Sequence, residues 1–231
     1  MPLGKSLGKF AKRLDTEFAI KAWLRGEPRP PRGGFDLAGE KIIDWGWICA
    51  NLPDGSKRAL EIGCGESPVI PAMLARGYDV VGLDFDPKVS RQLSGFRFVQ
   101  GDFNSVELTP GFDLIVACSA IEHFGLSGRY GSAEDPVGDL KAMQKIRSLL
   151  SDDGIAMVTI PVGIDVVHRP WHRVYGQQRL PLLLEGFRIV KSRFLVKAPW
   201  GPWRETSESI ALMHPPDIRR YALGELILAL S

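Results

Sequence analysis

The chain has 231 residues and a formal net charge of +2, and its hydrophobic (45%) and charged (24%) fractions are those of an ordinary globular protein. These values disfavour disorder, a collagen-like repeat and a disulfide scaffold, and the small charge argues against a dominant attraction to nucleic acid. Three cysteines without paired spacing, Cys49, Cys64 and Cys118, indicate a reducing compartment, so we expect a cytoplasmic protein without a thiol-ligated metal.

Residues 1–35 form a basic arm that ends in a linker rich in proline and glycine. Residues 1–32 carry eight basic and three acidic side chains, a net charge of +5, which leaves −3 on the remainder. Apolar residues recur in the arm at helical spacing, which predicts an amphipathic helix. This helix can pack on the domain or on a second copy in a homodimer, or it can contact a membrane surface peripherally. No apolar stretch is long enough to span a membrane.

Helix-like and strand-like segments alternate from residue 36 onward. We expect helices over 37–51, 68–76, 135–150 and 174–184, and strands over 58–62, 79–83, 96–100, 112–118, 155–160, 187–196 and 208–213. Continuous apolar strands separated by helices predict a doubly wound, three-layer α/β domain of Rossmann-like type over residues 36–214, with a mostly parallel sheet. The last two strands are expected to pair antiparallel. The apolar residues of 215–231 predict a C-terminal helix that packs on the domain or on a second subunit.

Glycines and acids follow the first two predicted strands. Gly63 and Gly65, on either side of Cys64, allow a tight turn and a close approach of a ligand to backbone N–H groups at the next helix. Asp84 follows about 20 residues later, where a carboxylate can accept both ribose hydroxyl hydrogens. Pro68 replaces the third glycine of the dinucleotide fingerprint, which counts against a pyrophosphate-binding dehydrogenase.

A further acid follows the third predicted strand. Asp102 is expected near the same crevice, where a carboxylate can take the exocyclic amine of an adenine, and Phe85 or Phe103 can cover the ring face. A cap or a solvated turn would explain any one of these acids. Three matching strand ends together favour a ligand that contains adenosine.

The order of these motifs resembles that of the class I S-adenosylmethionine-dependent methyltransferases. The matching segments are 59–65, 81–84, 101–102, 112–116, 121–123 and 149–154, within about residues 40–165. The resemblance implies the seven-stranded fold of that superfamily, with an antiparallel last strand, and S-adenosyl-L-methionine as the cofactor. It also implies the methionine tail over Glu61 to Gly65, ribose on Asp84 and adenine near Asp102 and Phe103. We expect Ser119, after the fourth strand, to contact the cofactor too.

A narrower likeness begins at the end of the fourth predicted strand. Segments 119–125, 128–131, 135–140 and 173–176 are similar to an uncharacterised branch of that superfamily. Its members are often associated with polysaccharide or glycosyl biosynthesis. The likeness suggests carbohydrate biosynthesis and a small or carbohydrate-linked acceptor, which we expect to be methylated at oxygen.

An alcohol acceptor needs a base that takes its proton, and histidine suits this role near neutral pH. His123, after the fourth strand, is the first candidate, although this segment can also simply cap the strand. His172, after the fifth strand, is the second. An acceptor pocket is expected from two arginines, for phosphate or carboxylate groups, and two aromatic rings, for sugar faces: Arg129, Arg173, Tyr130 and Tyr175.

Two other functions stay open. The chain can be a non-catalytic protein that binds an adenosyl ligand and uses its arm and tail for assembly, or an NAD(P)-dependent oxidoreductase. Nucleic-acid methylation is disfavoured, because residues 117–120 lack the Asn/Asp-Pro-Pro-aromatic string of amino-methylating enzymes and the domain lacks a basic stripe. No metal site is expected, because Pro170 interrupts the spacing of the only close histidine pair.

Overall fold

The computed structural model describes residues 39–55, 57–65, 67–87, 94–127, 133–197, 202–215, 217 and 220–231. The expected basic arm and its linker, residues 1–35, lie outside the described residues. Within the described residues, eight strands form one sheet in the order β3-β2-β1-β4-β5-β10-β8-β9. Their bounds are β1 Arg58–Ile62, β2 Asp79–Asp84, β3 Arg97–Gln100, β4 Phe112–Cys118, β5 Leu150–Val162, β8 Phe187–Lys197, β9 Trp203–Thr206 and β10 Ala222–Leu230.

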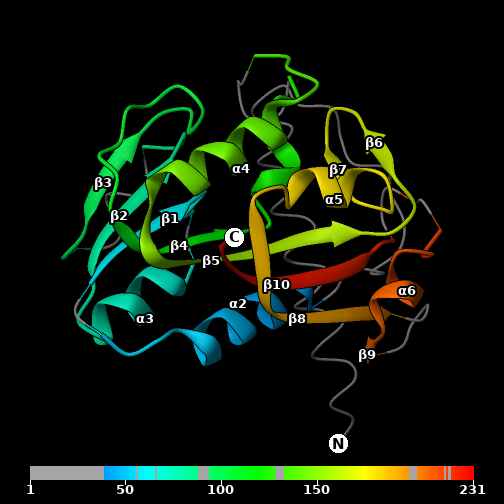
Figure 1. Ribbon diagram of the computed structural model, residues 1–231, viewed down its shortest axis with the longest axis horizontal. Coiled ribbons are helices and arrows are strands. Elements are labelled where there is room, and N and C mark those ends of the chain that lie inside the picture. Colours follow the sequence, from blue (N-terminus) through cyan, green and yellow to red (C-terminus); the bar gives the residue numbers. More distant parts are fainter. Residues whose placement is uncertain are drawn as a thin grey trace, which may run out of the picture.

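The first five strands of the sheet are parallel. β1 pairs with β2 and with β4, β2 pairs with β3, and β4 pairs with β5, all in the parallel sense. The helices cover both faces: α2 (Glu40–Asn51) and α3 (Val69–Ala75) lie on one face, and α4 (Gly138–Leu149) and α5 (Arg179–Leu183) on the other (Figure 1). This arrangement confirms the three-layer, doubly wound fold. The central strands are buried on both faces, which explains why their sequences are nearly continuous apolar runs.

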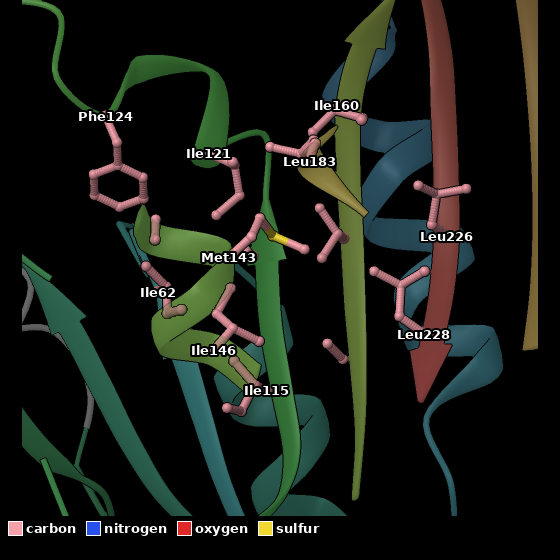
Figure 2. Close-up of a cluster of buried hydrophobic side chains, with 14 of the residues drawn as sticks. Ile62, Ile115, Ile121, Phe124, Met143, Ile146, Ile160, Leu183, Leu226 and Leu228 are labelled. Carbon is pink, nitrogen blue, oxygen red and sulfur yellow. The ribbon is translucent and has the colours of Figure 1, made fainter. Parts of the chain in front are cut away.

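Alternate residues of each central strand point to opposite faces of the sheet. On the α4 face, a single apolar cluster joins the strands to the helices above them (Figure 2). The labelled residues are Ile62, Ile115, Ile160, Leu226 and Leu228 from the strands, Met143 and Ile146 from α4, Leu183 from α5, and Ile121 and Phe124 from the segment after β4. The residues of β4 that alternate with Ile115, such as Leu114 and Val116, pack against α2 and α3 instead. The core is therefore two layers that share one sheet.

The C-terminal segment is a strand, so the expected C-terminal helix is wrong. β10 lies between β5 and β8 and is antiparallel to both, which confirms the antiparallel strand but assigns it to residues 222–230. The prediction failed because the apolar run of β10 has neither helical nor alternating periodicity. Its leucines and alanines favour a helix by their intrinsic propensity. The segment expected as the last strand, 208–213, instead contains the short helix α6 (Glu208–Ala211).

The helix expected over 174–184 begins later than expected, after a small hairpin that ends at Val174. The hairpin consists of β6 (Val166–His168) and β7 (His172–Val174), which pair antiparallel. The helix α5 begins only at Arg179, because the carboxylate of Asp165 accepts the backbone N–H groups of Gly176, Gln178 and Arg179 and so caps it there. A short 3-10 turn, η2 (Ile121–His123), follows β4. Among the described helices, none has the length and apolar character needed to cross a membrane.

The central position of β10 generates a prediction for stability. Leu228 is fully buried in β10, so Leu228→Ala should lower the free energy of unfolding by about 2–5 kcal/mol, because it removes apolar contacts and leaves a cavity. Leu182→Ala, at a leucine of α5 that is 56% exposed, is the matched control and should change it by less than about 0.5 kcal/mol. Urea denaturation measures both values, and equal losses would contradict the central placement of β10.

Candidate active site

The glycine turn after β1 is tied to the end of β2. Gly63 and Gly65 have φ of 66° and 44°, a region that strains residues with a side chain. Gly65 N donates to Asp84 Oδ2 (2.9 Å), and Asp86 N donates to the other carboxylate oxygen, Oδ1 (2.9 Å). A Cβ on Gly63 would lie 3.0 Å from Ala120 Cβ, so this turn also abuts the segment after β4. The structure thus brings the predicted glycines and Asp84 together.

Glu61, the last acid of β1, is enclosed beneath this turn. Its side chain is 1% exposed, and Oε1 accepts a hydrogen bond from Ser67 Oγ (2.5 Å). Ser67 Oγ in turn accepts from Val69 N (3.1 Å) at the start of α3. Oε2 has no hydrogen-bond partner among the residues that the structure describes. Burial raises the pKa of Glu61 to about 8, against the opposing hydrogen bond from Ser67, so this carboxyl is mostly protonated at neutral pH.

The residues expected around an adenine ring lie in two different environments. Gly101 N donates to Asp84 O (3.0 Å), which holds the turn after β3 beside the end of β2. Asp102 and Phe85 are both half-buried there, and Asp102 Oδ1 accepts from Asn104 N (3.0 Å). Phe103, in contrast, is fully buried and its ring centroid lies 5.9 Å from that of Phe124, so its ring face is occupied by the core.

Cys64 contributes only its backbone to the turn. Its side chain is 1% exposed and packs in the apolar cluster on the α3 side of the sheet. Burial raises the pKa of its thiol, and the nearby carboxyl of Glu61 raises it to a smaller extent. A thiol in this environment is inert packing, which agrees with a role for residues 63–65 through their N–H and C=O groups alone.

The chain turns sharply after β4 at Ser119. Ser119 has φ of 44°, and its N–H donates to the backbone and side-chain oxygens of Thr159, both at 3.0 Å. Its hydroxyl donates to Asp44 Oδ2 (2.9 Å), an acid of α2 that is fully buried. Burial and, to a smaller extent, the charge of the neighbouring Glu40 raise the pKa of Asp44 to about 7. Sequence reasoning missed Asp44, although a lone acid beside Trp47 and Ile48 on the apolar face of a helix is a usable signal.

The His123 ring is held between a carbonyl and a carboxyl group. Its Nδ1 lies 2.6 Å from Trp171 O, and since a carbonyl only accepts hydrogen bonds, we assign the proton to Nδ1. Its Nε2 lies 3.6 Å from Glu122 Oε1. The Glu122 side chain is buried, and this burial raises its pKa to about 8, although the charge of Lys41 acts in the opposite direction. The His123 side chain is 19% exposed, so it keeps an accessible edge.

Arg173 and Tyr175 do not line an acceptor pocket, and this expectation is wrong for their side chains. Arg173 is 1% exposed: its guanidinium donates to the carbonyls of Phe124 and Asp135, and its Nε lies 3.7 Å from Asp139 Oδ1. Tyr175 is fully buried in the apolar core. The physical reason is the β6–β7 hairpin, which turns these residues inward after β5. Arg129 and Tyr130 lie outside the described residues.

The second candidate base, His172, is also enclosed. It is 7% exposed, and its ring lies between those of His168 (5.3 Å between centroids) and Tyr221 (5.2 Å). Burial lowers the pKa of the neighbouring His168. Within the described ranges, no group of three His, Cys, Asp or Glu side chains has the arrangement of a metal site.

Comparison with known proteins gives one sequence match and many structural ones. The family model DUF268, described as a Caenorhabditis protein of unknown function, matches residues 73–196. A search of curated proteins finds no match.

Solved methyltransferases share the fold at low identity. The mitomycin 7-O-methyltransferase MmcR is 15% identical, with a TM-score of 0.55; the match covers 84% of this chain but only 55% of that longer protein. The 1,6-didemethyltoxoflavin-N1-methyltransferase of Burkholderia thailandensis, solved with S-adenosylhomocysteine, is 15% identical, with a TM-score of 0.55 and coverage of 97% and 90%. The N-methyltransferase NodS of Bradyrhizobium japonicum, also solved with S-adenosylhomocysteine, is 14% identical, with a TM-score of 0.54 and coverage of 85% and 88%. The fold is therefore that of the class I S-adenosylmethionine-dependent methyltransferases.

The buried carboxyl groups predict how stability depends on pH. The pKa values of Asp44, Glu61 and Glu122 are raised in the folded state, so the folded protein binds more protons than the unfolded chain between about pH 5 and about pH 8. The free energy of unfolding should therefore fall as the pH rises through this window. Glu61→Gln, which cannot ionise, should flatten the fall in Tm, whereas Asp153→Asn at an exposed acid should not. An unchanged slope in Glu61→Gln would contradict the assignment.

Proposed function

The chain belongs to the DUF268 family, and we propose that it is an S-adenosylmethionine-dependent methyltransferase. The observation that carries this proposal is the hydrogen bond from Gly65 N to Asp84, which couples the glycine turn to an acid at the next strand end. Open α/β sheets bind ligands at this edge, beyond the carboxyl ends of their strands. The fold shared with methyltransferases that were solved with S-adenosylhomocysteine supports the same cofactor.

The residues at this edge fit an adenosyl ligand with an amino-acid tail. Each Asp84 oxygen accepts one backbone N–H group and keeps a second lone pair for a ribose hydroxyl. A Cβ on Gly65 would meet only Gly63 O, at 3.9 Å, so the backbone of the turn is open to close approach there, and the buried Glu61 Oε2 lacks a partner among the described residues. We assign the ribose to Asp84, the methionine tail to residues 61–65 and the adenine to the region of Phe85 and Asp102. Phe103 is left out because the core encloses it.

The bound cofactor supplies a methyl group that is already activated, so the protein must position the acceptor and take up its proton. We propose a hydroxyl of a small or carbohydrate-linked molecule as the acceptor, beside the turn after β4. His123 is the base in this proposal: Nδ1 donates to Trp171 O, which leaves Nε2 as the basic nitrogen. Glu122 Oε1 lies 3.6 Å from this nitrogen. His172 ranks second because it is enclosed between two rings.

The ribose assignment is tested by Asp84→Ala. The variant loses a charged acceptor for two hydroxyls, so its dissociation constant for S-adenosylmethionine should rise by more than about tenfold. Asp79→Ala, at the exposed amino end of the same strand, is the matched control and should bind like the wild type. Calorimetric titration gives the constants, and Tm confirms folding. Wild-type affinity in a folded Asp84→Ala would remove the assignment, and no binding by the wild type would remove the proposed function.

The base is tested by His123→Ala with a panel of hydroxyl-bearing sugars and isotope-labelled S-adenosylmethionine. Turnover of any acceptor that the wild type methylates should fall by at least about 100-fold, because proton transfer from the hydroxyl loses its acceptor. The dissociation constant of the cofactor should stay unchanged. His214→Gln, at a histidine next to α6, serves as the control. Full turnover by His123→Ala would move the role of base to His172 or remove the need for a base.

A further inference from the structure

A groove runs along α2, and the proposed function does not use it. It has a volume of about 670 Å³ and lies between α2 on one side and β8 with β9 on the other. The side chains that give it an apolar lining are Ile42, Ile43, Trp47 and Ala50 of α2, Leu195 of β8 and Trp203 of β9. We call this feature the α2–β8 groove.

Two contacts fix the ends of the α2–β8 groove. At one end, a Cβ on Gly39, the first described residue, would lie 4.0 Å from the ring of Trp203. At the other end, Lys191 Nζ donates to Asn51 Oδ1 (2.6 Å). Because α2 has 12 residues, it spans about 18 Å between these contacts. The groove is therefore long enough for about three turns of a second helix.

The wall that α2 contributes has an open face. Ile42, Gly46 and Ala50 are four residues apart, so they lie on the same side of the helix. All three are exposed, Ile42 at 73%. A Cβ on Gly46 would meet no atom of the described chain within 4 Å outside its own helix. A glycine inside a helix weakens it relative to alanine, and the space that it leaves allows another segment to approach α2 closely.

The charged side chains in the groove are balanced within the domain. The guanidinium of Arg193 donates to Glu225 Oε1 (2.8 Å), and the lining contains one further cation, Lys191, and one acid, Glu205, among the described residues. The groove thus has no excess of one charge that would select an ionic ligand. Its apolar lining is the property that an occupant has to match.

We infer that residues 7–22 of the chain's own arm, which precede the described part, occupy the α2–β8 groove as an amphipathic helix. Leu7, Phe10, Leu14 and Phe18 recur at intervals of three or four residues, so they form one apolar stripe on that helix. The stripe packs on the apolar lining, and the open face of α2 accommodates it. The groove then completes the layer of helices on this side of the sheet.

The place where the described chain begins favours the chain's own arm as the occupant. Gly39 lies at the rim of the groove, beside Trp203. Residues 23–38 connect it to the arm helix, and 16 residues can reach across about 50 Å, well beyond the length of α2. A segment tethered so close has an effective concentration in the millimolar range, which favours it over the arm of a second copy.

Limited digestion of the full chain with trypsin tests this inference. The arm helix contains Lys9, Lys12 and Arg13, and trypsin can cut after them only when the helix opens. Gly46→Gln fills the space that the arm would occupy and leaves the rest of the described domain without a clash. Cleavage at the three sites, followed by mass spectrometry, should become at least about tenfold faster than in the wild type.

A variant of the arm and a matched control complete the test. Phe18→Gln should accelerate the same cleavages to a similar extent, and the double variant should be cut no faster than the faster single variant, because both changes remove one contact. Ile210→Gln, at an isoleucine of α6 that is 58% exposed and outside the groove, should be cut like the wild type. Circular dichroism confirms that each variant is folded.

Several outcomes would overturn the docking of the arm. One is a wild type that is cut as fast as Gly46→Gln and Phe18→Gln. Protection that grows between about 1 and about 100 μM protein, with a dimer in sedimentation, would assign the groove to the arm of a second copy. Protection that needs vesicles of anionic phospholipid would assign the arm to a membrane surface. None of these readouts uses cofactor or acceptor, so a failure here leaves the methyltransferase proposal standing.

Discussion

The geometry of the candidate site depends on one buried guanidinium. Arg173, on β7, donates to the carbonyls of Phe124 and Asp135 and faces Asp139 of α4, so it joins the hairpin, the η2 turn and the start of α4. Arg179 holds the other side of Asp139. An unpaired charge at this depth would cost several kcal/mol, so the carbonyls and the carboxylate cannot move independently. Arg173 therefore holds the turn that carries His123 and Glu122, in addition to the turn's own backbone hydrogen bonds.

Close contact between two backbone segments, at Gly125 and Gly138, also holds the turn after β4 in place. Gly125 has φ of 71°, and a Cβ there would lie 2.0 Å from Asp135 O; a Cβ on Gly138 would lie 2.8 Å from the Gly125 backbone. Only glycines allow the two segments to cross at this distance. Several residues expected at the acceptor site are thus used for packing. Arg173, Gly125 and Gly138 hold the turn that carries His123.

The sequence predicted the parallel half of the fold closely and the antiparallel half poorly. β4 has the expected bounds, 112–118, because a fully buried parallel strand is an uninterrupted apolar run between turn residues. The run that forms β10 is also largely apolar, but nothing local distinguishes a central strand from a buried helix, and its place between β5 and β8 follows from long-range pairing. In the site, Gly65 and Asp84 were found together because the strand-end rule brings them to one edge. Arg173 was misjudged because the sequence does not say which way a residue after a strand will turn.

The same reasoning explains why the buried carboxyl groups of Asp44 and Glu122 are harder to predict than the glycine turn. The glycine turn and Asp84 come from adjacent strands with one helix between them, so a short motif contains both. Asp44 and Glu122 instead come from α2 and from the turn after β4, and both act electrostatically on Tyr221, the residue before β10. Tyr221 also packs against His172 of the hairpin, so the C-terminal strand closes this side of the edge as well as the sheet. Three distant segments must meet before these carboxyl groups lose contact with water. Their raised pKa values are therefore a property of the assembled fold, and no short segment of the sequence predicts them.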